Sequence, residues 1–408
     1  MPSNGASDVV RRVMAAMPKP MWQRTSATAP GTRTSPARKC TKTSAAHRED
    51  PLLVRTARGE AVERTPVWLM RQAGRYMAEF RAYSDKYPFR MRSETPEIAV
   101  ELSLQPWRAF GTDAVIFFSD ILTPLPSVGV EFDVIKGKGP RIERPLRSME
   151  DVMQNVVDMG DPNEKLPFVR TILETLRHEI DESTALVGFV GAPWTLAAYA
   201  WEGKADRHLL HTKTAMTRQP EAVHLLLDKL TDMLAKYCVY QIDSGAQVMQ
   251  IFDSWAHHLS PEQFQVLSLP HVERIVQHIH EQRPGVPVIF HANGGVGKLK
   301  ALQGCTADVI GLDWNTDIAE ARQVLGPGRV LQGNVDPMLL FAPHETIQEA
   351  VHDCIHRAQP GPHILNVGHG VVQGTPEEAV KYFVQVAKES GPQQGYVAPA
   401  DRDLLTAQ

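Results

Sequence analysis

Short apolar runs and longer stretches with helical spacing alternate along the chain from about residue 65 onward. The short runs are rich in β-branched and aromatic residues, and Gly, Pro or polar residues separate them from the longer stretches, as is typical of strands and helices in alternation. We predict helices over Pro96 to Phe110 and Glu221 to Gln241, with Pro220 well placed near the start of the second. The predicted strands are Pro66 to Met70, Asp113 to Phe118, Ala185 to Val190, Gln247 to Phe252, Pro287 to Ala292, Asp308 to Asp313, Val330 to Val335 and His363 to Gly368.

This alternation predicts an α/β fold, because strands joined by helical crossovers pair in parallel. Eight repeats are what a (β/α)8 TIM-type barrel needs to close. A doubly wound open sheet could use the same elements. The barrel is favoured because polar residues follow the C-terminal ends of nearly all eight runs, where a barrel collects its active site. We expect a single barrel domain over residues 50–390 and a C-terminal tail over residues 391–408.

The first 46 residues differ in composition from the rest of the chain. They hold eight Lys or Arg residues and eleven Ser or Thr residues, against a single acidic residue, Asp8. A basic, hydroxyl-rich segment without a long apolar stretch is typical of an organellar transit peptide rather than a secretory signal. A disordered, solvated extension is the alternative. The expected location is the plastid stroma, with the mitochondrion or the cytosol as alternatives.

Charge and cysteine content exclude several functions. The chain has a net charge of −4, so removal of the segment with eight basic residues and one acidic residue leaves −11. A general basic surface for nucleic acid is therefore not expected, and an anionic ligand would need a local arginine cluster. The four cysteines form no C-x-x-C pair, which fits a reducing compartment. No apolar run approaches the roughly 18 residues that would span a membrane.

The strongest candidate site residues follow the first two predicted strands. Arg71 and Arg75 lie four residues apart directly after the first, and Asp120 follows the second. Arginine side chains bind carboxylates through two parallel hydrogen bonds and stay charged when partly desolvated. Structural ion pairs for the arginines and helix capping for Asp120 are the alternatives on spacing alone.

Further candidates follow the other strands. A phenol, a hydroxyl and an imidazole among aromatic side chains would form a polar site with apolar walls, the usual profile of a small-molecule pocket. No phosphate-binding glycine motif and no H-E-x-x-H zinc motif is present. Asp253, His257 and His258 could be imagined as metal ligands, but their loop context favours other roles. The candidate residues are Phe189, Tyr199, Phe252, Ser254 and His369.

Several segments together resemble the uroporphyrinogen decarboxylase family over roughly residues 50 to 390. The first of them is highly specific. The segments are Arg71-Gln72-Ala73-Gly74-Arg75-Tyr76, Phe118-Ser119-Asp120-Ile121, Gly191-Ala192-Pro193-Trp194-Thr195, Phe252-Asp253-Ser254-Trp255, Gly311-Leu312-Asp313-Trp314, Gln332-Gly333-Asn334-Val335-Asp336-Pro337 and Asn366-Val367-Gly368-His369-Gly370.

The resemblance implies a (β/α)8 barrel, usually a homodimer, that removes four acetate carboxyls from uroporphyrinogen III to give coproporphyrinogen III in haem and chlorophyll biosynthesis. It implies no cofactor and no metal. Asp120 would bind the pyrrole N–H groups and act in catalysis. The other residues that the resemblance assigns to substrate binding are Arg71, Ala73 and Arg75 at the carboxylates, Tyr199, Ser254 and His369 as polar contacts, and Phe189 and Phe252 as pocket walls.

Two other functions stay open from the sequence. Zinc-dependent methyltransferases of the same superfamily hold their metal with cysteine thiolates, but this chain has His291-Ala292-Asn293 and Gly368-His369-Gly370 at the corresponding places. A non-catalytic tetrapyrrole-binding paralogue is the second alternative. One departure from the family is His257, which replaces the usual Gly and leaves the conformation of its loop in question.

Overall fold

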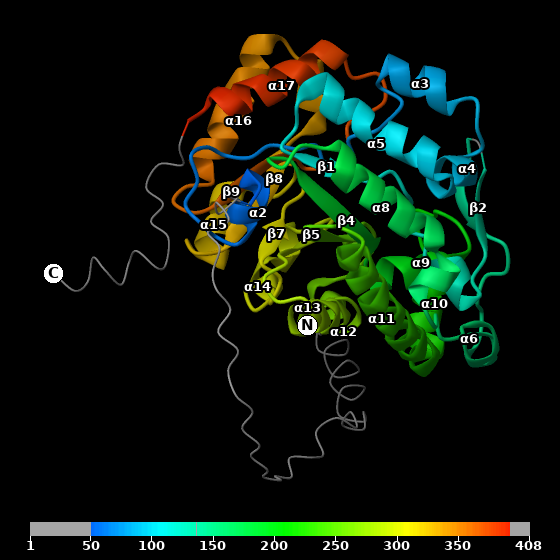
Figure 1. The fold of residues 1–408 in the computed structure, drawn as a ribbon. Helices are drawn as coiled ribbons and strands as arrows, with labels where there is room; N and C mark the ends of the chain where they lie inside the picture. Colours follow the sequence, from blue (N-terminus) through cyan, green and yellow to red (C-terminus); the bar gives the residue numbers. More distant parts are fainter. Residues whose placement is uncertain (1–49, 136, 392–408) are drawn as a thin grey trace, which may run out of the picture. The chain divides into compact units, whose positions relative to one another are not determined.

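The computed structural model describes residues 50–135 and 137–391 (Figure 1). The predicted transit peptide over residues 1–46 lies outside the described residues. So does the predicted C-terminal tail apart from residue 391. Among the described residues, no helix combines the length and the apolar character needed to cross a membrane.

Seven parallel strands form the central sheet, in the order β1-β4-β5-β6-β7-β8-β9. Each strand pairs with the next along the sheet, and most of their residues are buried on both faces, which explains the nearly continuous apolar runs in the sequence. The strands are β1 (Ala114–Ile116), β4 (Ala185–Gly191), β5 (Val248–Asp253), β6 (Val288–Ala292), β7 (Val309–Gly311), β8 (Val330–Val335) and β9 (His363–Val367).

The first predicted strand, Pro66 to Met70, closes the barrel although it is not a regular strand. Only Val67 pairs in the strand manner, through a parallel bridge to Leu365 of β9. The Leu365 N–H donates to the Pro66 carbonyl (2.9 Å), and the Val67 carbonyl accepts from the Asp113 N–H (2.9 Å) beside β1. The segment therefore joins β9 to β1, which confirms the barrel and excludes the open sheet. The prediction of a full strand here was wrong, because the backbone turns at Met70, where φ is 38°.

An ion pair fixes this closing segment. Both guanidinium nitrogens of Arg64 donate to the two carboxylate oxygens of Asp113, at 2.7 and 2.5 Å. The same Asp113 carboxylate accepts from the Val67 N–H at 2.8 Å. The buried Asp113 carboxylate thus links the closing segment to β1. The backbone of the closing segment forms few hydrogen bonds of its own, so this link helps to hold it in place.

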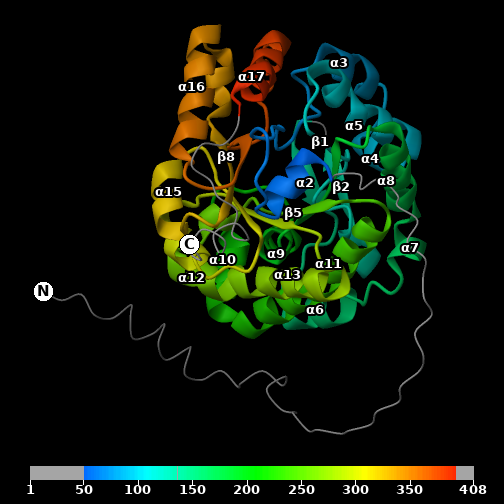
Figure 2. The same cartoon turned by 60° about the vertical axis from the view of Figure 1, so that its left-hand side comes forward.

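The inside of the barrel is a small apolar core with one end covered by helix α2 (Leu52–Ala57). Figure 2 shows this helix, in blue, lying across the strands in the middle of the ring of helices. Above the apolar layer, Gln332 receives a hydrogen bond from the Trp68 indole (2.9 Å) and donates to Gln250 (3.2 Å). The core residues around α2 are Leu53, Val54, Ala57, Trp68, Ala114, Ala185, Val187, Val248, Ile289, Val309, Val330 and Ile364.

Helices return the chain along the outside of the barrel, and a larger apolar cluster fills the space between them and the strands (Figure 1). The predicted helix over Pro96 to Phe110 is confirmed as α5, and the second predicted helix is slightly longer, as α11. The helices are α3 (Ala78–Ser84), α4 (Phe89–Glu94) and α5 (Pro96–Phe110) before β1; α6 (Met149–Asn155), α7 (Pro162–Lys165) and α8 (Pro167–Glu179) before β4; α9 (Pro193–Glu202), α10 (Leu210–Arg218) and α11 (Pro220–Asp243) before β5; α12 (Pro261–Leu267) and α13 (Leu269–Gln282) before β6; α14 (Leu299–Leu302) before β7; α15 (Ile318–Leu325) before β8; α16 (His344–Arg357) before β9; and α17 (Glu377–Glu389) after it.

Shorter elements occupy the connections that follow the strands. An antiparallel hairpin of β2 (Phe132–Ile135) and β3 (Gly139–Ile142) follows β1 and was not predicted. Its two four-residue strands show no regular alternation of exposed and buried positions, so the pattern alone does not separate them from a loop. The 3-10 turns are η2 (Leu125–Val128), η3 (Ala256–His258), η4 (Val296–Lys298) and η5 (Pro337–Phe341).

Candidate active site

The loop after the closing segment presents the two candidate arginines. Gln72, which is almost fully buried, holds this loop from inside: its amide accepts from the Leu69 N–H (3.2 Å) and donates to the Ala114 carbonyl of β1 (3.1 Å). The Tyr76 hydroxyl donates to the Gln72 carbonyl at 2.8 Å. The sequence had not singled out Gln72 as a positioning residue, because its partners are set by the barrel closure.

Within the described residues, neither the Arg71 nor the Arg75 guanidinium forms a hydrogen bond or an ion pair. The alternative of structural ion pairs is therefore wrong for both side chains. The neighbouring protein lowers the pKa of Arg71 by desolvation, against an opposing effect of Asp120. The two guanidinium groups are free to bind an anion, and Ala73 lies half-buried between them in the sequence.

Gly370 provides the surface against which Arg71 rests. A Cβ atom at Gly370 would lie 2.6 Å from Nε and 2.8 Å from Nη2 of Arg71. The backbone after β9 therefore sets the position of a side chain that follows the first barrel segment. The contact between Arg71 and Gly370 could not be predicted from the motifs, because the two residues lie far apart in the sequence.

Asp120 follows β1 and shares the barrel mouth with Arg71. Its carboxylate accepts from the Leu122 N–H at 2.8 Å. Desolvation raises the pKa of Asp120, while the Leu122 hydrogen bond and the Arg71 charge oppose the rise. Arg71 thus supplies the charge that favours an ionised Asp120, as expected. Arg75 is not among the groups that shift the pKa of Asp120.

Tyr199 of α9 lies close enough to Asp120 and Arg71 for both charges to act on its phenol. Burial, and then the Asp120 charge, raise the pKa of Tyr199 to about 12. Its ring packs against Trp255 with the ring centres 4.2 Å apart. The phenol therefore keeps its proton and can donate a hydrogen bond.

The two predicted wall residues, Phe189 of β4 and Phe252 of β5, pack edge to face with ring centres 5.8 Å apart. Phe117 lies 5.0 Å from Phe189, and the His291 ring lies 6.3 Å from Phe252. Aromatic rings from four neighbouring strands or strand ends thus form one continuous apolar surface.

Ser254 and His257 form one connected turn after β5. The His257 Nδ1–H donates to the Ser254 carbonyl at 3.1 Å, and the Asn293 amide donates to the same oxygen at 3.2 Å. This arrangement accommodates the side chain at position 257 within η3. The departure from the family therefore leaves an ordered turn around Ser254.

His369 follows β9 next to Arg71. Its Nδ1 accepts a hydrogen bond from the Gly370 N–H (2.7 Å), so the neutral ring carries its proton on Nε2. Desolvation, and then the Arg71 charge, lower the pKa of His369. A neutral imidazole with an Nε2–H group can donate a hydrogen bond to a carboxylate.

Asp253, at the end of β5, is fully buried and is hydrogen-bonded to residues that follow neighbouring elements. Its carboxylate accepts from Thr195 (2.6 Å) and Ser268 (2.5 Å), and desolvation raises its pKa to about 6. The Trp194 indole donates to the Trp255 carbonyl at 3.1 Å. Two segments of the resemblance, after β4 and after β5, are thus bound to each other.

The metal hypothesis for Asp253, His257 and His258 finds no geometric support. Over residues 50–135 and 137–391, no group of three or more His, Cys, Asp or Glu side chains is arranged to hold one metal ion. The three cysteines in this part of the chain are buried, and burial raises the pKa of each thiol. The thiolate ligands of a zinc methyltransferase are therefore missing here.

The fold is that of a (β/α)8 barrel, and the candidate residues lie at or after the C-terminal ends of its strands. Residues 48–390 match the family model described as uroporphyrinogen decarboxylase, so the chain belongs to that family. It is 48% identical over 342 residues to a uroporphyrinogen decarboxylase of Crocosphaera subtropica, and the match covers 84% of this chain and 96% of that protein. It is 49% identical to one of Microcystis aeruginosa, with 84% and 97% covered.

The solved structures support the same architecture. A methyltransferase from Methanosarcina mazei superimposes with a TM-score of 0.71 and 20% sequence identity, covering 84% of this chain and 99% of the other. At this identity the likeness concerns the fold alone. It does not revive the methyltransferase hypothesis, which needs thiolates that the site lacks.

Proposed function

We propose that this protein converts uroporphyrinogen III to coproporphyrinogen III by removing the four acetate carboxyls as CO2. The observation that carries the proposal is the pairing of Arg71, whose guanidinium makes no ion pair in the described structure, with a desolvated Asp120. Two relatives that cover most of the chain are named as uroporphyrinogen decarboxylases, which supports the proposed class of reaction.

Asp120 is proposed to stabilise the cation that forms during decarboxylation. Protonation of a pyrrole ring carbon creates an electron sink whose positive charge is shared with the ring nitrogen. The C–C bond electrons then move into the ring as CO2 leaves, the exocyclic carbon takes up a proton, and the ring carbon loses one. Each carboxylate thus consumes one proton overall. An ionised Asp120 beside the nitrogen favours the charged intermediate most where water is excluded.

The remaining site residues are proposed to bind the substrate. Arg71 and Arg75 would hold carboxylates, and Ala73 would line the loop between them. Arg71 is a poor proton donor because a guanidinium stays protonated near neutral pH. The proton would come from the imidazolium form of His369, which is a stronger acid than a guanidinium, or from solvent through a bound water. Polar contacts would come from Tyr199, Ser254 and His369, and the apolar walls from Phe189 and Phe252.

An anaerobic assay with uroporphyrinogen III tests the proposal. Chromatography of the oxidised products should show successive loss of carboxyls from eight to four, and a metal chelator should not change the rate. An unchanged eight-carboxyl substrate, with tetrapyrrole binding retained, would instead favour the non-catalytic paralogue.

We expect Gly370→Ala to lower kcat/KM about tenfold, because a Cβ atom would displace the Arg71 guanidinium. The melting temperature should stay almost unchanged, since the displaced atoms end a flexible side chain. Gly304→Ala is the control, because a Cβ at Gly304 meets nothing within 4 Å. Equal activity in the two variants would contradict the packing role of Gly370.

The pH profile of kcat/KM should have an acid limb above the ordinary aspartate pKa of 3.8, because desolvation raises the pKa of Asp120. Activity is lost as pH falls through this value, since protonation removes the charge opposite the cation. Arg71 lowers the same pKa. In Arg71→Gln the limb should therefore move to higher pH, and a limb that stays or moves lower would contradict this coupling.

Residues 1–46 are proposed to be a transit peptide that directs the protein to the plastid, and the folded chain is proposed to form a homodimer. The composition of the segment supports the first proposal. A fluorescent reporter fused to residues 1–50 tests it, and accumulation in mitochondria or cytosol would refute the plastid assignment. Sedimentation of the purified protein tests the dimer.

A further inference from the structure

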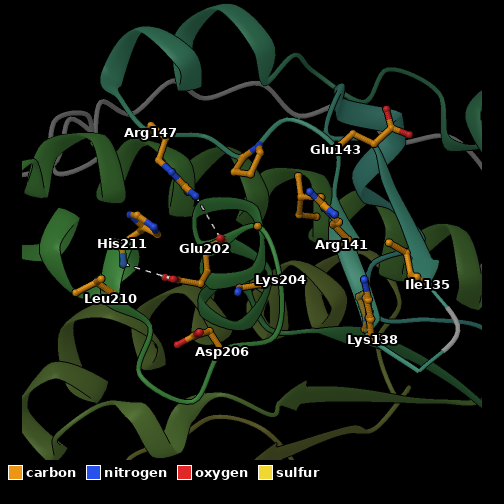
Figure 3. A pocket seen from close by; sticks show the side chains of 15 residues that line it. Ile135, Lys138, Arg141, Glu143, Arg147, Glu202, Lys204, Asp206, Leu210 and His211 are labelled. Atoms are coloured by element: carbon orange, nitrogen blue, oxygen red, sulfur yellow. Dashed lines mark hydrogen bonds between the residues drawn. The ribbon is translucent and has the colours of Figure 1, made fainter.

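A cavity of about 640 Å³ lies between the β2–β3 hairpin and the C-terminal end of α9 (Figure 3). It is outside the set of residues that the proposed function uses. The charged residues of its wall include Lys138, Arg141, Glu143, Glu202, Lys204 and Asp206.

The hairpin is bound to the helix that carries Tyr199. The Ile142 N–H donates to the Gly203 carbonyl (2.8 Å), and Arg141 pairs with Lys204 in an antiparallel bridge. Glu202, in the cavity wall, follows Tyr199 by three residues on the same helix. That separation is about 4.5 Å along a helix axis. The cavity therefore begins one helical turn from a residue of the candidate active site.

Two of the acidic side chains in the wall already have partners. The Glu202 carboxylate accepts from the Thr212 N–H and from its hydroxyl, both at 3.0 Å. Asp206 accepts from the His208 N–H at 2.8 Å and from the Leu209 N–H at 3.2 Å. These carboxylates stabilise the local backbone and lie at the base and one side of the cavity (Figure 3).

Three cations of the wall are candidates to bind a ligand, and the charge of one of them, Lys204, lowers the pKa of Asp206 in the same wall. In the part of the chain that the structure describes, the side chains of Lys138, Arg141 and Lys204 form no hydrogen bond and no ion pair within 4 Å. All three are exposed. Figure 3 shows Lys138 and Arg141 on the hairpin, and Lys204, the bridge partner of Arg141, directly after the C-terminal end of α9. Glu143 is the remaining carboxylate, and its carboxyl group is directed away from Lys204 in this view.

The proposed substrate needs such cations. Uroporphyrinogen carries eight carboxylates, whereas the barrel mouth offers Arg71 and Arg75 beside an acidic Asp120. Outside its first 46 residues the chain has a net charge of −11, so its general surface repels a polyanion. A second local group of cations, at the end of the helix that carries Tyr199, would offset that repulsion.

We propose that Lys138, Arg141 and Lys204 form a second carboxylate-binding subsite, which holds peripheral carboxylates of the tetrapyrrole while another part of the macrocycle lies at Asp120. This inference rests on the proposed function. The subsite binds but does not react, so it acts on substrate affinity. Its contribution is greatest for the eight-carboxyl substrate and declines as carboxyls are lost.

Kinetics of the triple variant Lys138→Gln, Arg141→Gln, Lys204→Gln test the subsite. KM for uroporphyrinogen III should rise about tenfold, with kcat within twofold of the unaltered protein, because exposed cation–carboxylate pairs contribute modestly each. KM for the five-carboxyl intermediate should rise less. The control triple variant removes the same charge elsewhere, at the exposed Lys165, Lys300 and Lys381.

A KM in the triple variant equal to that of the control would overturn the subsite. So would a changed sedimentation coefficient, which would make the cavity a contact between two protein copies. The double variant Lys138→Arg, Lys204→Arg retains the charges and should keep the original KM. A rise in its KM as large as in the triple variant would also overturn the subsite. Failure of the proposed function is separate: the unaltered protein would then produce no CO2.

Discussion

Asp120→Asn is expected to lower kcat by about 10²- to 10³-fold, the loss typical when one preorganised electrostatic group is removed. The Asp120 carboxylate is desolvated. It accepts a hydrogen bond from the Leu122 N–H, which the side-chain oxygen of an asparagine can also accept. The substitution therefore removes the charge while preserving the shape. Steady-state kinetics with uroporphyrinogen III provide the measurement, with KM expected to change far less than kcat.

Ser254→Ala is the matched comparison. Ser254 holds its turn through its backbone carbonyl, which accepts from His257 and Asn293, so loss of the hydroxyl leaves the turn intact. We expect a decrease of less than about tenfold, the contribution of one neutral hydrogen bond. Equal losses of kcat in the two variants would contradict the assignment of charge stabilisation to Asp120.

Arg71→Gln is expected to lower kcat/KM about 100-fold. A hydrogen bond to a charged group contributes about 1.5 to 3 kcal/mol, and a guanidinium can form two to one carboxylate. The loss should affect KM through the missing carboxylate contact and kcat through Asp120, whose ionised form Arg71 favours. Arg71→Lys should recover only part of the activity, because an ammonium retains the charge without the paired geometry.

The variants Arg75→Gln and Arg218→Gln distinguish the specific effect of Arg71 from the general effect of removing a positive charge. Arg75 is exposed in the same loop and does not act on Asp120, so its loss should raise KM with little effect on kcat. Arg218 is an exposed residue at the end of α10, and its loss should change neither parameter. A change in kcat for Arg75→Gln as large as for Arg71→Gln would refute the distinct role of Arg71.

The elements of the barrel could be predicted from the sequence because their signals are local. A run such as Val330 to Val335 is apolar throughout since both faces of its strand are buried, and its predicted bounds agree with β8. The helix over Pro96 to Phe110 has a proline at its first position and Gly111 directly after its end, so both its limits are visible in the sequence.

The hairpin and the closing segment show where the local signal ends. β2 and β3 are too short to indicate a strand pair by pattern, and the hairpin forms a backbone hydrogen bond to Gly203, directly after α9. At Pro66 to Met70 the apolar pattern is present, but only Val67 forms a parallel bridge, to Leu365, and the backbone turns at Met70. In both places, partners distant in the sequence decide the conformation.

The sequence by itself determined the fold class, the family and the presence of Arg71, Arg75 and Asp120 after the first two barrel segments. Only the tertiary structure decided how these residues are placed: Gln72 holds the arginine loop, Gly370 leaves room for Arg71, and the cations of the hairpin line a cavity together with the end of α9. The physical reason is the distance in sequence over which each kind of interaction acts. Periodicity and turn chemistry act over a few residues, whereas the site is assembled when the barrel closes and brings its first and last strands together.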